Sequence, residues 1–113
     1  MSKPTVVDVG NAFGRFPAGR SRSDSLFSGE AFREDVAEPA LADGGEVVFD
    51  FSGVVGFPSS FLEEAFGVLI RMAIRRGDDP DALITRIKVI SPTDTSLAEE
   101  VRQCMMDASR NQL

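Results

Sequence analysis

The sequence has no histidine and only one cysteine, Cys104, among its 113 residues. Without histidine, the chain lacks the commonest general base and metal ligand, and a Ser-His-Asp hydrolytic triad is impossible. A single cysteine excludes an internal disulfide and a thiolate metal site built within one chain. These absences predict a protein that is not an enzyme and that uses neither a metal nor a cofactor. The lack of a disulfide is typical of the reducing cytoplasm.

Long apolar runs and basic charge are also scarce. The chain carries 12 Lys and Arg against 18 Asp and Glu, a net charge of −6, which argues against binding to nucleic acid or to acidic membranes. The N-terminus lacks the apolar run of a secretory signal, and the apolar stretch at 61–74 is too short to span a bilayer. A hydrophobic content of 42% indicates one globular domain, residues 1–113, which we expect in the cytoplasm.

The stretch 46–77 organises the chain. Val47, Val48 and Phe49 form an unbroken apolar run, which is typical of a strand buried on both faces. After a glycine-rich loop, apolar residues recur from 61 to 73 at three- and four-residue intervals, the period of a helix. Together with the flanking elements, these patterns predict a core that contains Val47, Phe49, Phe51, Phe66, Leu69, Ile70, Ile87, Val89, Leu97 and Val101.

Shorter patterns predict the other elements. We expect a strand at 4–9, an edge strand at 15–19, a helix at 30–41, a polar connection with a partial turn at 78–85, a strand at 86–91 and a helix at 96–110. Ser96 and Glu99 match the S-x-x-E capping box for the last helix. Strands that alternate with helices predict an α/β fold, a small mixed sheet of about four strands with helices packed mainly on one face.

The run DFSGVVGFPSSFLEEAFG, residues 50–67, resembles the central motif of STAS domains, the fold of bacterial anti-sigma-factor antagonists. Residues 50–54 match its D-L-S-x-V block, and Ser59 and Ser60 match the serine pair that follows. The sequence is more similar still to a STAS-like family of unknown function, whose motif resembles DF-x-G-V followed by S-S-F-x-x-E. Residues 14–34 also resemble the N-terminal region of that family, so the resemblance covers most of the chain.

The resemblance implies a STAS-like fold and a non-catalytic regulatory module that binds a protein partner through residues 52–66. By the same resemblance, the partner is a kinase-like anti-sigma factor or a sensor ATPase. Ser59 aligns with the serine that is phosphorylated in the antagonists, while Pro58 stands where they carry aspartate and Phe61 where they carry glycine. The implied site comprises Ser59 and Ser60 as the switch, with a loop and partner surface made by Asp50, Ser52, Gly53, Phe57, Phe61 and Glu64.

The same residues also allow simpler roles. Ser60 and Glu63 fit the S-x-x-E spacing, so Ser60 is expected to cap its helix. Glu63 and Glu64 complement the positive end of the helix dipole. Asp50 is expected to accept a hydrogen bond from the backbone of the turn that follows it. Phe61 is expected either to face a partner or, alternatively, to pack into the core.

Two other functions stay open. Arg15, Arg20 and Arg22 could hold a phosphate or nucleotide together with the N-terminus of the 60–76 helix, although a phosphate-loop lysine is absent. Alternatively, a sheet with helices on one face could bury its open face against a second copy, which would make the protein a homo-oligomer. Cys104, beside two methionines, is expected in the core rather than as a reactive thiol.

Overall fold

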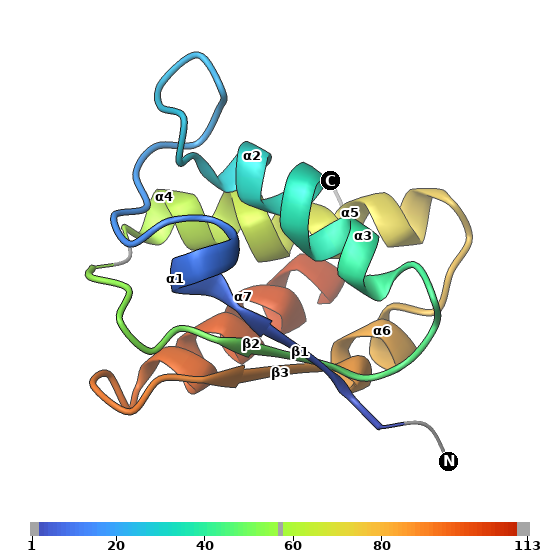
Figure 1. The fold of residues 1–113 in the computed structure, drawn as a ribbon. Coiled ribbons are helices and arrows are strands. Elements are labelled where there is room, and N and C mark those ends of the chain that lie inside the picture. The colour runs from blue at the N-terminus through green and yellow to red at the C-terminus, as the bar shows by residue number, and fades with distance from the viewer. Residues whose placement is uncertain (1–2, 57, 111–113) are drawn as a thin grey trace.

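A three-stranded parallel sheet forms the base of the protein (Figure 1). The computed structural model describes residues 3–56 and 58–110. The strands lie side by side in sequence order, as β1 (Thr5–Asp8), β2 (Val47–Asp50) and β3 (Ile87–Ile90). The expected α/β class is confirmed. The expectation of a mixed sheet of about four strands is wrong, because the described residues form three strands and both pairings are parallel.

The segment 15–19, which the sequence predicts as an edge strand, forms a loop. Pro17 lacks the backbone N–H that a ladder needs, so it is poorly suited to pairing. Gly19 adopts a φ of +82°, a left-handed conformation that interrupts an extended strand. The three observed strands begin and end within one residue of their expected positions.

Helices connect the strands and close the chain. Between β1 and β2 lie α1 (Val9–Ala12), α2 (Gly29–Phe32), the π-helical segment η1 (Arg33–Ala37) and α3 (Glu38–Leu41). Between β2 and β3 lie α4 (Ser59–Leu62), the π-helical segment η2 (Glu63–Gly67), α5 (Val68–Arg75) and α6 (Pro80–Arg86). The last helix is α7 (Leu97–Arg110). Helical segments follow one another without a break at 29–41 and 59–75, which confirms the two long helices expected there.

Helix α6 replaces the polar connection and partial turn that the sequence predicts. Its N-cap is Asp79, whose side chain accepts a hydrogen bond from the N–H of Asp81 at 3.0 Å. Pro80 occupies the first turn, where its missing N–H costs nothing. The Asp-Pro pair is therefore the local signal that reveals this helix.

The start of α7 also differs from its prediction. The hydroxyl of Ser96 donates to the Asp94 carboxylate at 2.7 Å, and Glu99 pairs with Arg102 at 3.4 Å. Within the described part of the chain, the expected capping box between Ser96 and Glu99 is not formed. None of the described helices is long and apolar enough to cross a membrane.

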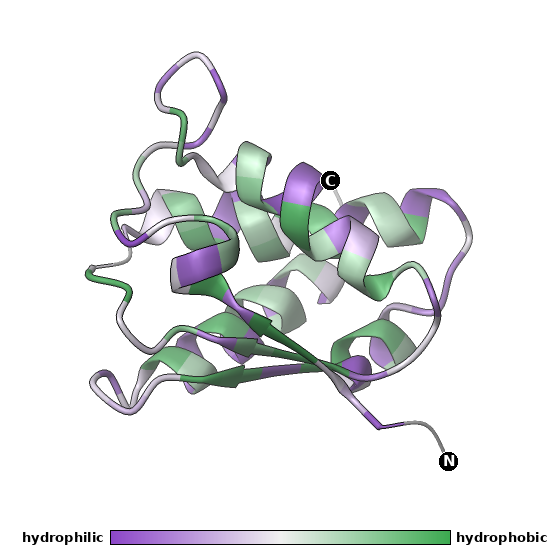
Figure 2. Cartoon of the chain, in the orientation of Figure 1, coloured by the Kyte–Doolittle hydropathy of each residue, from purple (hydrophilic) through white to green (hydrophobic). Residues whose placement is uncertain are grey.

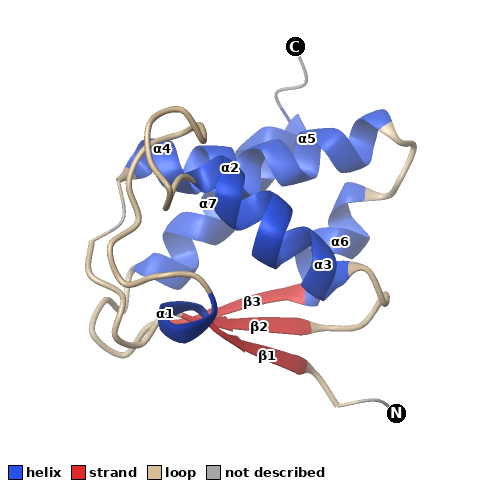
Figure 3. Ribbon diagram, turned by 45° about the horizontal axis from the view of Figure 1, so that its top comes forward, coloured by secondary structure: helices blue, strands red, loops and turns tan. Residues whose placement is uncertain are grey.

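The long helical segments lie on one face of the sheet (Figures 1 and 3). The reason is topological, since successive right-handed crossovers that step in one direction place each connecting helix on the same side. Val7, Phe49 and Val89 form one row across the sheet. This row faces the helices, and Phe49 at its centre is fully buried.

The opposite face of the sheet is open. Val6 is 63% exposed, Ile90 is 46% exposed, and Val48 on the central strand is half-buried. Figure 2 shows that the strands are hydrophobic over most of their length even though this side is uncovered. The expectation that β2 is buried on both faces is therefore wrong, because no described helix covers the second face. Burial of this face against a second copy stays a prediction.

A cluster of phenylalanine rings fills the space between the helices and the sheet. Phe32, at the end of α2, is fully buried. Its ring centroid lies 5.4–6.0 Å from the centroids of Phe13, Phe49, Phe51, Phe61 and Phe66. Aromatic pairs at such distances contribute about 0.5–1.5 kcal/mol each beyond the burial of their area. The Phe32 ring of α2 thus connects the segments that follow α1 and β2 with β2 itself and with the 59–75 helix.

The predicted core is confirmed with one exception. Every residue named in it is buried except Val89, which is half-buried because β3 is an edge strand. Phe32, the centre of the ring cluster, is absent from the prediction because the apolar pattern around it is weak. Cys104 is half-buried rather than part of the fully buried core.

Phe66→Ala should lower the free energy of unfolding by about 3–5 kcal/mol, because loss of a fully buried ring leaves a cavity against β2. Urea denaturation measures the change. The matched control is Phe16→Ala, which removes the same ring from a residue that is 66% exposed. The control should change stability by less than about 1 kcal/mol, and a similarly small loss for Phe66→Ala would show that its ring is not buried in solution.

Candidate functional site

The candidate site lies at the carboxyl ends of the strands, on the left of Figure 1. Three loops lie at this end: residues 13–28 follow α1, residues 51–56 follow β2, and residues 91–96 follow β3. In parallel α/β sheets the loops at this edge carry most binding sites, because the scaffold beneath them is rigid. The serine pair and the predicted partner surface therefore belong to the edge at which such sites are common.

Asp50 ends β2 and shapes the turn that follows it. Its Oδ1 accepts a hydrogen bond from the N–H of Ser52 at 2.9 Å, which confirms the expected turn aspartate. Hydrogen bonds from the hydroxyl and the backbone N–H of Ser52 hold the pKa of Asp50 below its usual value. Gly53 continues the turn with a φ of +81°, which side-chain-bearing residues rarely adopt. These three predicted site residues form one compact turn with an ionised carboxylate.

Arg15 ties the long loop 13–28 to this turn. Its Nε donates to the carbonyl of Gly53 at 3.1 Å, and its own carbonyl accepts from the N–H of Val55 at 2.7 Å. The two bonds hold the loops beside each other. Sequence reasoning misses this role because the partners are far apart in the chain and no local pattern links them.

Arg22 belongs to the same loop but pairs with the helices. It forms ion pairs with Asp35 at 2.8 Å and Glu34 at 3.0 Å, and these bonds raise its pKa. The carbonyl of Arg20 accepts from the N–H of Glu30 at 2.9 Å, which anchors the loop to α2. The three arginines of the ligand-binding alternative are therefore attached to different elements, and that alternative stays a prediction.

Helix α4 begins at the serine pair. Pro58 is the N-cap and provides no side-chain hydrogen bond, so Ser59 and Ser60 are the first two helical residues. The prediction that Ser60 caps the helix is wrong, because the Pro58 carbonyl already accepts from the N–H groups of Phe61 at 3.0 Å and Leu62 at 3.3 Å. Ser59 is exposed and Ser60 is half-buried, so Ser59 is the more accessible hydroxyl of the pair.

Ser59 borders a cavity of about 570 Å³ between α4 and α7. Three carboxylates line the same cavity, those of Glu63, Glu100 and Asp107. Glu63 forms an ion pair with Arg71, which offsets its charge. The other two carboxylates come from the exposed side of α7, so the surroundings of Ser59 are acidic.

The side chain of Glu64 points to the crossing between η1 and the 59–75 helix rather than toward the loop after β2. It pairs at 3.3 Å with Arg33, which is only 6% exposed and also pairs with Glu38 at 3.0 Å. A buried guanidinium needs such partners because its desolvation is costly. A Cβ on Gly29 at this crossing would lie 2.7 Å from the carbonyl oxygen of Phe61, so glycine permits the close approach. Glu64 thus acts in packing, and Arg33 is a residue that sequence reasoning missed.

Two phenylalanines belong to the predicted partner surface. Phe61 is fully buried, and its ring packs at 5.8 Å from Phe32 and 6.2 Å from Phe13. This matches the alternative that Phe61 packs into the core, and it removes the ring from the surface. Phe57 lies outside the described residues.

Four exposed apolar side chains lie on loop 13–28 and on the loop between β2 and Ser59. The exposed fractions are 66% for Phe16, 85% for Leu26, 40% for Phe27 and 58% for Val55. Backbone bonds connect their segments, since residue 18 donates to the carbonyl of Phe27 at 2.9 Å and residue 55 donates to the carbonyl of residue 15. We call these four residues the docking patch. They carry no periodic pattern, so the sequence does not reveal them.

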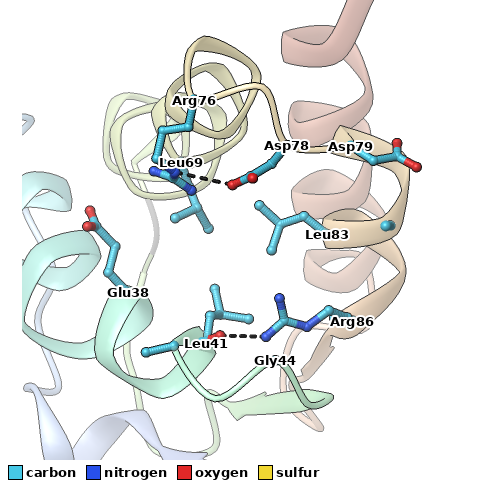
Figure 4. Close-up of a pocket in the computed structure, with 11 residues that line it drawn as sticks. Glu38, Leu41, Gly44, Leu69, Arg76, Asp78, Asp79, Leu83 and Arg86 are labelled. Atoms are coloured by element: carbon cyan, nitrogen blue, oxygen red, sulfur yellow. Dashed lines mark hydrogen bonds and ion pairs between the residues drawn. The ribbon is translucent and has the colours of Figure 1, made fainter.

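A second cavity lies at the amino ends of the strands, between α3, α5 and α6 (Figure 4). It measures about 480 Å³, and its apolar lining includes Leu41, Leu69 and Leu83. Its arginines are engaged within the fold. Arg76 pairs with Asp78 at 3.2 Å, and the guanidinium of Arg86 donates to the carbonyls of residues 41 and 45. These contacts hold the helix ends together at the edge opposite the candidate site.

Cys104 provides a test of the packing between α4 and α7. Burial, with a smaller contribution from the charge of Glu63, raises the pKa of its thiol to about 11. Because only the thiolate reacts, iodoacetamide at pH 8 should modify the folded protein roughly 100-fold more slowly than the urea-unfolded chain. The rate should keep rising as the pH increases beyond 9. Mass spectrometry of timed samples measures both rates, and equal rates would contradict burial of the thiol.

Comparison with protein-family models matches residues 28–97, more than half of the chain, to the STAS-like domain of unknown function (DUF4325). The match begins at the N-cap of α2 and ends at the first residue of α7. It therefore includes the Asp50 turn, the serine pair and the crossing between Arg33 and Glu64. No curated protein and no solved structure matches the chain. The resemblance seen in the sequence is confirmed, and the chain belongs to this STAS-like family.

Proposed function

We propose that this STAS-like protein is a non-catalytic regulatory module that binds a partner protein through the docking patch. The observation that carries the proposal is the exposure of Phe16, Leu26, Phe27 and Val55 on adjacent loops beside the serine pair. Clustered apolar side chains at the surface are typical of interaction sites, because burial in a complex removes them from water. Aromatic anchors often supply much of the binding free energy in such sites.

The docking patch is attached to the core, which favours binding by reducing the entropy lost on association. The ring of Phe13 packs edge-on against Phe27 at 5.7 Å and against the buried Phe32 at 5.4 Å. Arg15 adds a side-chain bond to Gly53 and a backbone bond to Val55 in the loop after β2. Both loops therefore present their apolar side chains from fixed positions.

The partner that the family resemblance suggests is a kinase-like anti-sigma factor or a sensor ATPase, and phosphorylation of Ser59 would control the contact. Ser59 is exposed in the first turn of α4, close in sequence to Val55 of the docking patch. The backbone N–H groups that open the helix can donate hydrogen bonds to a phosphate with the fold intact. A phosphate adds a charge of about −1.5 to −2, which is enough to alter an interface.

Charges around Ser59 favour an effect on the partner surface rather than on the fold. Glu63 and Glu64 are paired with Arg71 and Arg33, so they oppose a nearby phosphate less than free carboxylates would. The acidic residues of α7 that line the cavity would add to the phosphate charge. Phosphorylation would thus place strong negative charge beside an apolar surface and leave the buried core unchanged.

Capture from a lysate of the native host tests the proposal. Immobilised wild-type protein should recover an ATPase-fold kinase or another protein of a sigma-factor pathway. A Phe16→Ser, Leu26→Ser double variant should recover at least about 10-fold less of it, because two exposed anchors are lost. Val6→Ser is the matched control on the open sheet face and should bind normally. Equal recovery by the double variant, or no such protein with wild type, would contradict the proposal.

The switch is tested with the captured partner. Ser59→Asp should weaken binding by about 1–3 kcal/mol, the usual size of a regulatory coupling, with little change in melting temperature. Ser59→Ala should bind like wild type and no longer respond to the kinase. Ala82→Asp adds the same charge in the first turn of α6, at the other end of the sheet, and should bind normally. Equal affinities for all four proteins would eliminate Ser59 as the switch.

A further inference from the structure

The outer edge of β3 is open. This strand pairs with β2 on one side, and within the described chain no strand lies on the other side. An open edge presents backbone N–H and C=O groups with which another extended chain can pair. Figure 3 shows that β3 is the strand nearest to α6 and α7, so these helices flank its unpaired edge.

The ladder determines which backbone groups point outward. The N–H of Phe51 donates to the carbonyl of Ile90 at 2.8 Å, so Ile90 directs its backbone toward β2. Because alternate residues of a parallel strand bond to opposite sides, Val89 directs its N–H and C=O outward. The N–H of Ile87 is already bonded to the carbonyl of Ile84 at the end of α6. An added strand would therefore pair chiefly with Val89 and with the carbonyl of Ile87.

A groove of about 590 Å³ follows this edge between β3, α6 and α7. Methionine side chains in it can adapt to ligands of different shape. Successive side chains of an added strand would point alternately into the groove and toward the open sheet face. Every second residue of the occupant should thus be apolar, to match a lining that includes Ile84, Ile87, Val89, Val101, Met105 and Met106.

The charges at this edge distinguish between two occupants of the groove, a segment of a partner protein and a second copy of this chain. Lys88 is exposed on β3, on the sheet face away from the helices, so it favours an acidic side chain next to it. A second copy pairing through β3 would bring another Lys88 to the same edge, and edge lysines oppose this kind of self-pairing. Arg102 at the groove forms an ion pair with Glu99 at 3.4 Å, so its charge is offset within α7. An acidic partner segment therefore fits better than a second copy.

We propose that the β3 edge and its groove bind an extended segment of a partner protein, in which apolar residues alternate with acidic ones, as a fourth strand. The apolar side chains occupy the groove, the acidic ones lie beside Lys88, and the backbone pairs with Val89. This surface shares no residue with the docking patch. It is thus a second interaction site, and it can fail or succeed independently of the function proposed above.

The probe is the acetylated and amidated peptide Glu-Val-Glu-Ile-Glu-Val, titrated into the full-length protein and followed by NMR. Its binding should shift the signals of Ile87, Val89 and Met105. Hydrogen exchange of the Val89 amide should slow by at least about 10-fold at saturation, because that N–H gains a partner. The Val48 amide on the central strand is the internal control and should not change. A peptide with lysine in place of every glutamate should bind at least about 10-fold more weakly.

Lys88→Glu should reverse this preference, so that the lysine peptide binds better than the acidic one. Arg75→Glu is the matched control, because it makes the same change of charge at an exposed position on α5 and should keep the acidic preference. Equal binding of both peptides, a preference that survives Lys88→Glu, or unchanged exchange at Val89 would overturn the proposal. Protection of Val89 that grows with protein concentration alone would identify a second copy as the occupant and would also overturn it.

Discussion

The packing of Phe32 is the contact on which the rest of the structure depends. Its buried ring meets rings from the end of α1, β2, the loop after β2, α4 and η2. These contacts determine where the loop after β2 leaves the sheet and where loop 13–28 enters α2. Because the docking patch lies on these two loops, the position of the surface follows from the packing of the core.

The helix crossing beside Phe32 also arranges the charges. Gly29 allows α2 to approach the 59–75 helix closely, and Arg33 then reaches across to Glu64. Glu64 is thereby paired across the crossing, while Glu63 is paired with Arg71 of its own helix. The carboxylates near Ser59 that form no ion pair within the described residues, Glu100 and Asp107, come from α7 instead. An apolar surface next to an acidic cavity is a suitable arrangement for binding that responds to added negative charge.

The regular elements could be predicted from the sequence because their signals are local and periodic. An unbroken apolar run located β2, and apolar spacing located the 59–75 helix, so that nearly all of the predicted core was found. Contacts between distant residues have no such signal, so the pairing of Arg33 with Glu64 and of Arg15 with Gly53 could not be foreseen. For the same reason, the family motif located the serine pair but did not show that Phe61 is buried or that the docking patch is exposed.

Cross-saturation NMR tests most directly whether the docking patch meets the partner. In a complex of the methyl-labelled protein with the partner captured from the host, irradiation of the partner reduces the signals of methyl groups at the interface. We expect reduced signals for Leu26 and Val55 and unchanged signals for Leu69, which lines the cavity at the opposite edge (Figure 4). Unchanged signals for Leu26 and Val55, with losses confined to Leu69 or to Met105 in the β3 groove, would contradict the central claim.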